Sequence, residues 1–210
     1  MFISFEGIDC SGKSTQIALL AESLRTRGYN VLIVREPGGT VISEHIRSMV
    51  LDLNHGEIDS HTELLLFSAS RSQLVVERIE PFLADGGIVI ADRFHDSTTA
   101  YQGYGRGLDI ASIQEIHTVA THGIVPDLTF FLDISVEESL LRRSQRAGEV
   151  DRMEASNTAF FTRVREGYHT IATSAPRVRI IDGDRQIPVI FDEIRKHTIA
   201  ILPSLDDKEI

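Results

Sequence analysis

The stretch Gly7–Ser14, which reads GIDCSGKS, decides the fold. It matches G-x-x-x-x-G-K-[ST], the pattern of a loop whose backbone N–H groups surround the phosphates of a nucleoside triphosphate. The apolar run Ile3–Phe5 comes before it, and an amphipathic helical pattern begins at Lys13. The positive end of that helix adds to the field at the phosphates. In this context the motif predicts a nucleoside-triphosphate site on an α/β fold.

Lys13 and Ser14 provide the polar side chains of this loop. A lysine at this position reaches the β- and γ-phosphates, and the serine hydroxyl ligates Mg²⁺. Lys13 is the only lysine in the first 195 residues. Asp92 ends a later strand pattern, at the edge of the sheet where an acidic side chain can hold the metal through water. We therefore expect Mg²⁺ beside Ser14 and Asp92.

Short apolar runs alternate with helical patterns along the rest of the chain. The apolar runs lack regular polar alternation, which is typical of strands buried on both faces. This order predicts one α/β domain, a five-stranded parallel sheet with helices on both faces. The expected strands are Phe2–Phe5, Asn30–Arg35, Gly87–Ala91, Asp127–Asp133 and Arg177–Ile181. The expected helices are Lys13–Arg27, Val41–Leu51, Ser60–Ala84, Ile110–His122, Val136–Gln145, Ala155–Ser174 and Pro188–Ile201.

The composition narrows the function classes. A length of 210 residues fits a single domain over 1–210, with an acidic tail at about 204–210. The net charge of −10 disfavours nucleic-acid partners. No apolar run approaches the roughly 20 residues of a membrane-spanning helix, and a basic signal segment is absent. The single cysteine, Cys10, excludes a disulfide framework. We expect a cytoplasmic protein with no membrane partner.

The loop alone does not separate kinases from GTPases and ATPase motors. A GTPase should also contain Asn-Lys-x-Asp, yet none of Asn30, Asn54 and Asn157 is followed by lysine. A motor needs coupling elements for which this chain has no length. A small phosphotransferase remains, acting on a nucleotide, a deoxynucleoside or a non-nucleotide acceptor. A nucleotide-binding switch without turnover also stays open.

Further motifs make the chain similar to bacterial thymidylate kinases over essentially its whole length. They are REPGGT at 35–40, Phe67-x-x-x-Arg71, DRFHDS at 92–97, YQG at 101–103 and DRME at 151–154. The resemblance implies the nucleoside-monophosphate-kinase version of the P-loop fold. It implies transfer of the γ-phosphoryl group of ATP to dTMP with Mg²⁺, which gives dTDP and ADP for dTTP synthesis. It also implies a homodimer.

The same resemblance assigns an acceptor site. Arg93 offers a planar fork that suits the phosphate of dTMP. Phe67 and Arg71 share one face of a predicted helix, so the ring can stack on the pyrimidine while the guanidinium donates to O4. Without the resemblance, a core phenylalanine beside a solvated arginine explains that pair better. The implied dTMP-binding residues are Glu36, Pro37, Arg47, Phe67, Arg71, Arg93, Ser97, Thr98, Tyr101 and Gln102.

Arginines gather in the segment at about 142–154, which we predict to be a lid over the triphosphate. The phosphate loop itself has no arginine, so the resemblance implies that a lid arginine acts in its place. A solvated helix end with surface ion pairs is the alternative. The predicted catalytic residues are Lys13, Arg93, Arg146, Arg152 and Asp9, whose acid needs Mg²⁺ or an arginine beside phosphates. The predicted ATP-binding residues are Gly7, Ile8, Asp9, Cys10, Ser11, Gly12, Lys13, Ser14, Thr15 and Arg142.

Overall fold

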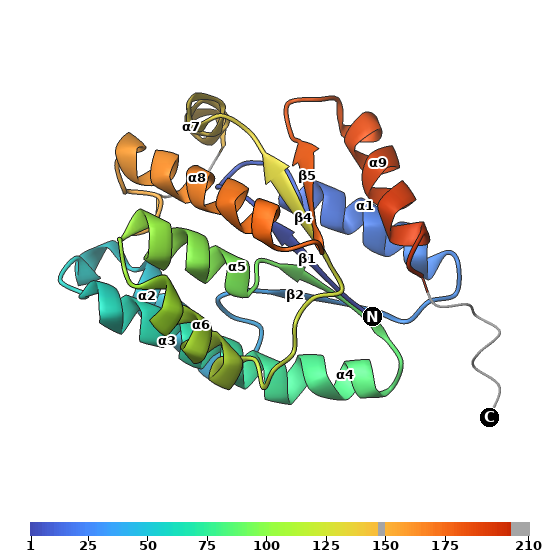
Figure 1. Ribbon diagram of the computed structural model, residues 1–210, viewed down its shortest axis with the longest axis horizontal. Coiled ribbons are helices and arrows are strands. Elements are labelled where there is room, and N and C mark those ends of the chain that lie inside the picture. The colour runs from blue at the N-terminus through green and yellow to red at the C-terminus, as the bar shows by residue number, and fades with distance from the viewer. Residues whose placement is uncertain (147–149, 203–210) are drawn as a thin grey trace.

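Within residues 1–146 and 150–202, which the computed structural model describes, five strands form one sheet in the order β2-β3-β1-β4-β5 (Figure 1). Every neighbouring pair is parallel. The strands are β1 (Phe2–Glu6), β2 (Val31–Arg35), β3 (Ile88–Asp92), β4 (Leu128–Asp133) and β5 (Val178–Asp182). The expected parallel sheet with helices on both faces is confirmed. The predicted tail at about 204–210 lies outside the described residues.

Helices cover both faces of the sheet (Figure 1). Those on one face are α1 (Lys13–Arg25) and α9 (Ile187–Ile199), which share a buried cluster with the strands. The remaining helices are α2 (Val41–Leu51), α3 (Ser60–Leu74), α4 (Glu80–Ala84), α5 (His95–Thr98), α6 (Ile110–Ala120), α7 (Val136–Gln145) and α8 (Thr158–Ser174). Short helical segments are η1 (Leu53–His55), η2 (Val75–Ile79) and η3 (Thr99–Gly105).

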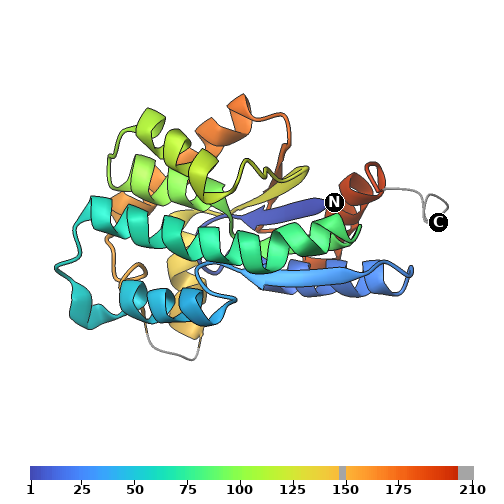
Figure 2. The ribbon, with the colours of Figure 1, turned by 90° about the horizontal axis from the view of Figure 1, so that it is seen from below.

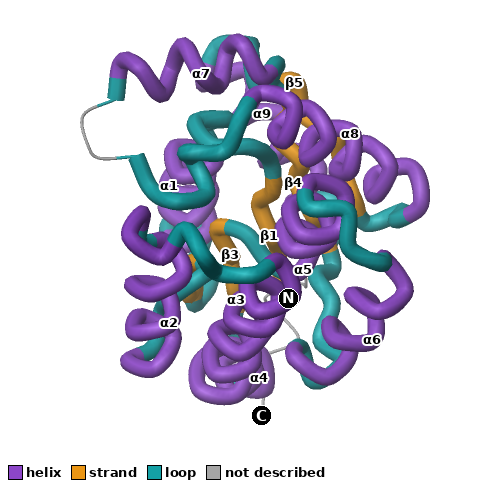
Figure 3. The backbone as a smooth tube through the Cα atoms, turned by 90° about the vertical axis from the view of Figure 1, so that its left-hand side faces the viewer, coloured by secondary structure: helices purple, strands orange, loops and turns teal. Residues whose placement is uncertain are grey.

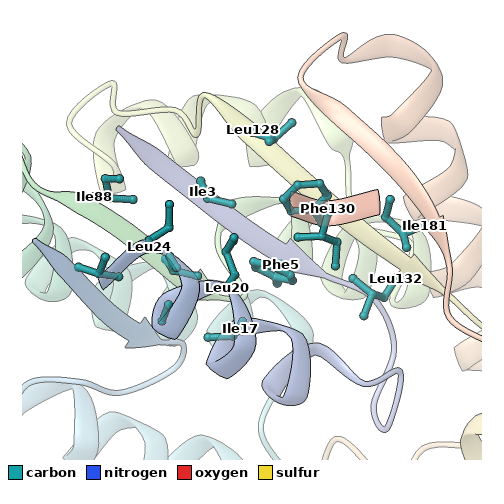
Figure 4. Packing of buried hydrophobic residues seen from close by; sticks show 14 of the residues in the cluster. Ile3, Phe5, Ile17, Leu20, Leu24, Ile88, Leu128, Phe130, Leu132 and Ile181 are labelled. Carbon is teal, nitrogen blue, oxygen red and sulfur yellow. The ribbon is translucent and has the colours of Figure 1, made fainter. Parts of the chain in front are cut away.

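The core explains why the strands lack polar alternation. Apolar side chains on one face of β1 and β4 meet α1: Ile17 and Leu20 lie beside Phe5, and Leu24 lies on the side of Ile3 and Ile88 (Figure 4). On the opposite face, other strand residues pack against α8 and against the α3–η2–α4 segment. Each large apolar side chain buried in this way stabilises the fold by roughly 1.5–3 kcal/mol relative to exposure.

Two helical regions differ from the expectation. The helix predicted over Ser60–Ala84 forms one continuous helical rod, in which a π-helical segment, η2, separates α3 from α4 (Figure 2). The run from His95 to Gly105 is helical, although the predicted helices do not include it. Its two threonines and two glycines are weak helix formers. It packs tightly against α8: a Cβ on Gly105 would lie 2.6 Å from the Phe160 ring. Tertiary packing therefore overrides the local preference.

The carboxyl ends of the strands meet at one edge of the sheet. The register pairs Arg35 of β2 with Asp92 of β3, so two polar strand ends lie side by side there. Figure 3 views this end of the molecule, where α2, α7 and α8 surround the central strands. Ligands of open parallel sheets bind at this edge. None of the helices in 1–146 and 150–202 combines the length and apolar character that spanning a membrane would require.

Candidate active site

The loop between β1 and α1 is shaped to receive an anion. Gly7 has φ +136°, and a Cβ there would lie 2.5 Å from the Leu132 carbonyl oxygen, so only glycine fits. Gly12 caps α1 and offers no side-chain hydrogen bond. The helices α2, α3, α6, α7 and α8 all have a capping side chain instead. The first-turn N–H groups of α1 are therefore left for a phosphate.

Lys13 is buried and folded back onto this loop. Its Nζ donates to the carbonyl oxygens of Gly7, at 3.1 Å, and Ile8, at 3.0 Å. It also lies 3.4 Å from the Ser11 hydroxyl. Burial, together with the charge of Arg93, lowers the pKa of Lys13 to about 8. Negative phosphate groups at this loop would stabilise the protonated amine.

Ser14 and Asp92 lie together at the mouth of the loop. The Ser14 Oγ donates to Asp92 Oδ2 over 3.0 Å. A hydroxyl and a carboxylate are hard oxygen ligands, which fits an Mg²⁺ ion that takes its other ligands from substrate phosphates and water. Among the described residues, no group of three His, Cys, Asp or Glu side chains could hold a metal by itself. The donor set therefore suits a metal that arrives with a nucleotide.

Arg93 connects the loop to the neighbouring cavity. Its Nη1 donates to the Gly7 carbonyl oxygen over 2.8 Å, and its Nη2 lies 2.6 Å from Asp9 Oδ1. The residue adopts φ +71°, a left-handed conformation that costs energy outside glycine. Burial favours the protonated form of Asp9, but the charges of Arg93 and Lys13 outweigh it and hold the pKa of that carboxyl below its ordinary value. Asp9 thus has the arginine partner that the sequence required.

Glu6 is a site residue that the sequence analysis missed. Its carboxylate accepts from the Phe94 N–H at 2.8 Å, the Ser97 hydroxyl at 2.5 Å and the Tyr168 hydroxyl at 3.2 Å. Both hydroxyls in turn accept from Arg93 Nη1. Burial, with the charge of Asp96, raises the pKa of Glu6 to about 8. The available signal was an acidic residue at the end of a buried apolar strand.

A cavity of ≈ 180 Å³ opens beside Arg93. All of the residues predicted to bind dTMP line it: Glu36, Pro37, Arg47, Phe67, Arg71, Arg93, Ser97, Thr98, Tyr101 and Gln102. The residues of its lining that were not predicted for this role are Arg35, Leu51, Asp92, Asp151 and Met153. The structure therefore brings the whole predicted set, dispersed over 67 positions from Glu36 to Gln102, into one enclosure.

Arg71 is not a solvated arginine. It is 1% exposed, and its Nε and Nη2 bind Glu36 Oε2 at 2.8 and 2.6 Å. Nη2 also donates to the Thr98 hydroxyl over 2.9 Å. Among the described residues, Arg71 Nη1 has no hydrogen-bond partner. A buried guanidinium with one free donor at a cavity wall calls for an acceptor from a ligand.

The turn that follows β2 forms another wall of the cavity. The Glu36–Pro37 peptide bond is cis, a point that the sequence left open. The Pro37 carbonyl oxygen accepts from Arg47 Nη1 over 2.8 Å. Burial, together with the charge of Arg35, lowers the pKa of Arg47 from its ordinary value. Arg47 thus connects α2 to this turn and is a second cation in the lining of the cavity.

The lid arginines point in different directions. Arg142 pairs with Glu138 at 2.6 Å, as the surface alternative predicted, and also donates to the Gly183 carbonyl oxygen over 3.2 Å. Arg146 pairs with Glu154 at 2.8 Å. Arg152 donates to the Val50 carbonyl oxygen over 2.7 Å, so it faces α2. Residues 147–149 of the predicted lid lie outside the described residues.

The other loop residues show no separate chemistry. Ile8 is buried in a hydrophobic cluster, and the Thr15 side chain is exposed. Cys10 is half-buried in a left-handed conformation, with φ +61°. Burial raises the pKa of its thiol, so the neutral form is favoured. Ile8 and Cys10 can therefore offer their backbone N–H groups to a bound phosphate, while the exposed Thr15 also carries a hydroxyl.

Comparison of the sequence and the structure with those of known proteins identifies a protein family. The family model described as thymidylate kinase matches residues 5–194. The chain is 48% identical to the thymidylate kinase of Chlorobaculum parvum, over 100% of this chain and 98% of that protein. It is 46% identical to the thymidylate kinase of Prosthecochloris aestuarii, over 100% of this chain and 97% of that protein. The crystal structure of thymidylate kinase from Ehrlichia chaffeensis superposes with a TM-score of 0.77 and 38% identity, over 95% and 98% of the two chains.

Proposed function

The chain belongs to the thymidylate kinase family, and from that premise we propose how its residues phosphorylate dTMP with ATP to give dTDP and ADP. One observation supports the proposal above the others. Arg93 bonds to Gly7 of the phosphate loop and also lines the cavity, so a donor site and an acceptor site adjoin at one sheet edge. In-line transfer between two nucleotides needs this arrangement.

The loop is the proposed ATP site. The backbone N–H groups at the start of α1 and the Lys13 amine hold the β- and γ-phosphates. Ser14 and Asp92, 3.0 Å apart, would hold Mg²⁺, which neutralises phosphate charge when bound. Arg142 packs on the adenine in this proposal, which its hydrogen bond to Gly183, beyond the loop, supports.

The cavity is the proposed dTMP site. Arg93 binds the phosphate, with Arg47 as a second cation in the cavity lining. Phe67 stacks on the base, and the free Nη1 of Arg71 donates to O4. Tyr101, whose ring lies 5.1 Å from the Arg93 guanidinium carbon, packs against the sugar. Gln102 completes the contacts to the base.

The reaction then depends on positioning and cations. A phosphate has a second pKa of about 6, so the acceptor oxygen of dTMP is mostly dianionic at neutral pH and needs no general base. The barrier lies in bringing two polyanions into line. Lys13 holds the phosphates of ATP and Arg93 holds the phosphate of dTMP. We propose that Arg146 neutralises the charge that develops on the transferred phosphoryl group. Arg152 anchors the lid to α2 instead of reaching the phosphates.

A panel of phosphoryl acceptors tests this function. ADP release is measured with dTMP, dUMP, dCMP and AMP at fixed ATP, and dTMP should give the highest kcat/KM. An ATP turnover that ignores the acceptor would instead favour a nucleotide switch. Equal use of an unrelated acceptor would point to another small kinase.

We also propose the assembly and location of the enzyme. The chain works as one domain, and it dimerises through α3 and α6, which expose Leu65 and Val119 at 57% and 76%. A shallow groove between those helices continues the apolar surface. Location in the cytoplasm is supported by the single free thiol of Cys10, which suits a reducing compartment.

A further inference from the structure

Glu63 is a buried acid in the first turn of α3, and no motif of the chain includes it. It is 1% exposed, yet donors surround it. Its Oε1 accepts from Gln102 Nε2 at 2.8 Å and Arg106 Nε at 3.1 Å. Its Oε2 accepts from Arg106 Nη2 at 3.1 Å and lies 2.7 Å from Arg152 Nη1. A carboxylate offers about four acceptor positions, so this one is saturated.

The ionised state of Glu63 follows from these partners. Burial alone would favour the neutral acid, but the hydrogen bonds from Arg106 and Gln102 and the two arginine charges outweigh it. The pKa of Glu63 is therefore lowered from its ordinary value. An ionised carboxylate accepts hydrogen bonds and donates none.

This acceptor fixes the orientation of the Gln102 side chain. The amide must turn its NH₂ group toward Glu63, because its carbonyl oxygen would meet a carboxylate oxygen at 2.8 Å without a proton between them. Gln102 also lines the cavity. Its Oε1 accepts from no group in the described part of the chain, so it remains available to a ligand.

We propose that Glu63 sets the hydrogen-bonding polarity of the base site, by holding the Gln102 amide so that an acceptor stands beside the Arg71 donor. The inference rests on the proposed dTMP site. A base that satisfies both groups has an N–H for Gln102 and a carbonyl for Arg71, as thymine and uracil have at N3 and O4. Cytosine presents a bare N3 and an amino group, so both contacts fail.

The variant Glu63→Gln tests this role. The carbonyl oxygen of the new amide keeps Arg106 Nη2 and Arg152 Nη1, the two donors at Oε2. Its NH₂ group then takes the position of Oε1, where it faces Gln102 and displaces the hydrogen bond from Arg106 Nε. Gln102 must turn its own oxygen toward that group and its NH₂ toward the base. One hydrogen bond of about 1.4 kcal/mol corresponds to tenfold in rate. We expect kcat/KM for dTMP to fall about tenfold, and the preference for dTMP over 5-methyl-dCMP to narrow by tenfold or more.

Arg106→Lys is the matched control. It weakens the same ion-pair cluster but leaves the Glu63 carboxylate facing Gln102. It should lower thermal stability and keep the wild-type ratio of kcat/KM for dTMP and 5-methyl-dCMP. An unchanged ratio in Glu63→Gln, with wild type selective for dTMP, would overturn the role of Glu63. Wild type without dTMP turnover would instead overturn the proposed function.

A second measurement covers failure of Glu63→Gln to fold. In wild-type protein labelled with ¹⁵N, the side-chain amide of Gln102 is assigned with Gln102→Glu. Its protons should exchange slowly with water both before and after addition of dTMP, because they bind a buried carboxylate. Exchange at the rate of a free amide in both states would contradict the proposal.

Discussion

At the scale of single residues, the account depends on cations that are buried before substrate arrives. Lys13 donates to carbonyl oxygens of its own loop, and Arg71 leaves one donor free at the cavity wall. Arg71 is held in place by Glu36 and Thr98, so it needs little reorganisation when a base binds. Lys13 must release one of its loop acceptors when a phosphate binds, because all three of its donors are used. Burial also lowers the pKa of Lys13, so this lysine loses its charge at a lower pH than an ordinary lysine does.

The lowered pKa of Lys13 predicts a specific pH dependence. As pH rises through about 8, Lys13 in the free enzyme loses its proton and the cation that ATP needs. The kcat/KM for ATP should then fall about tenfold per pH unit above that point. The kcat should decline only at higher pH, since bound phosphates raise the pKa of Lys13.

The variant Lys13→Arg provides the control, because a guanidinium does not titrate in this range. Its activity is expected to be lower but independent of pH between 7 and 9.5. A wild-type kcat/KM for ATP that stays flat to pH 9.5 would refute the role given to Lys13.

Residues in local motifs could be predicted, but residues with distant partners could not. Gly7 and Lys13 follow from one short stretch whose chemistry is contained in its own spacing. Glu6 and Glu63 have no such context, since their donors lie 39 or more positions away along the chain. Only the three-dimensional arrangement reveals why a buried acid is tolerated at either position.

At the scale of elements, the lid divides into two arms with different contacts. Arg146, at the end of α7, pairs with Glu154 and affects the Cys10 thiol of the phosphate loop through its charge. Arg152 instead binds the end of α2 and Glu63 of α3. The two arginines predicted together from the sequence therefore have different protein partners.

This division predicts different kinetics for two variants. Arg146→Ala should lower kcat by about 10³–10⁵-fold with little change in the KM for dTMP, as expected for a cation that acts on the transferring group. Arg152→Ala should mainly raise the KM for dTMP. Steady-state kinetics with both substrates varied distinguishes them. The reverse pattern would exchange the two roles.

The strands were predictable as elements, whereas the segment from α5 to η3 was not. A parallel strand needs only a short apolar run, and each of the five runs supplies one, including the edge strands β2 and β5, which are only partly buried. The α5–η3 segment forms against α8, through close contacts such as that of Gly105 with Phe160. Helix propensity does not include such contacts, so the segment that contains Thr98, Tyr101 and Gln102 could be placed in the site only by resemblance.

At the scale of the whole molecule, the two proposed nucleotide sites share one edge of the sheet, and the proposed dimer face lies on α3 and α6. Glu63 and Arg71 also belong to α3, so the same helix would link the subunit contact to the base site. An exposed apolar surface over two adjacent helices is typical of an interface between copies.

Val119→Asp should separate the proposed dimer. A charge at the centre of an apolar contact is strongly destabilising, so sedimentation velocity should show a dimer for wild type and a monomer for the variant. Val189→Asp, an exposed valine on α9, is the matched control and should remain dimeric. A wild-type monomer at micromolar concentration would contradict the assembly.

The central claim is that two separate anion sites face each other, one built around Lys13 and one around Arg93. Calorimetric titration of dTMP into Lys13→Ala tests it most directly. The account predicts a dTMP Kd within about twofold of wild type, together with a loss of turnover of about 10²–10³-fold or more. Loss of dTMP binding in this variant, or turnover that persists in it, would contradict the claim.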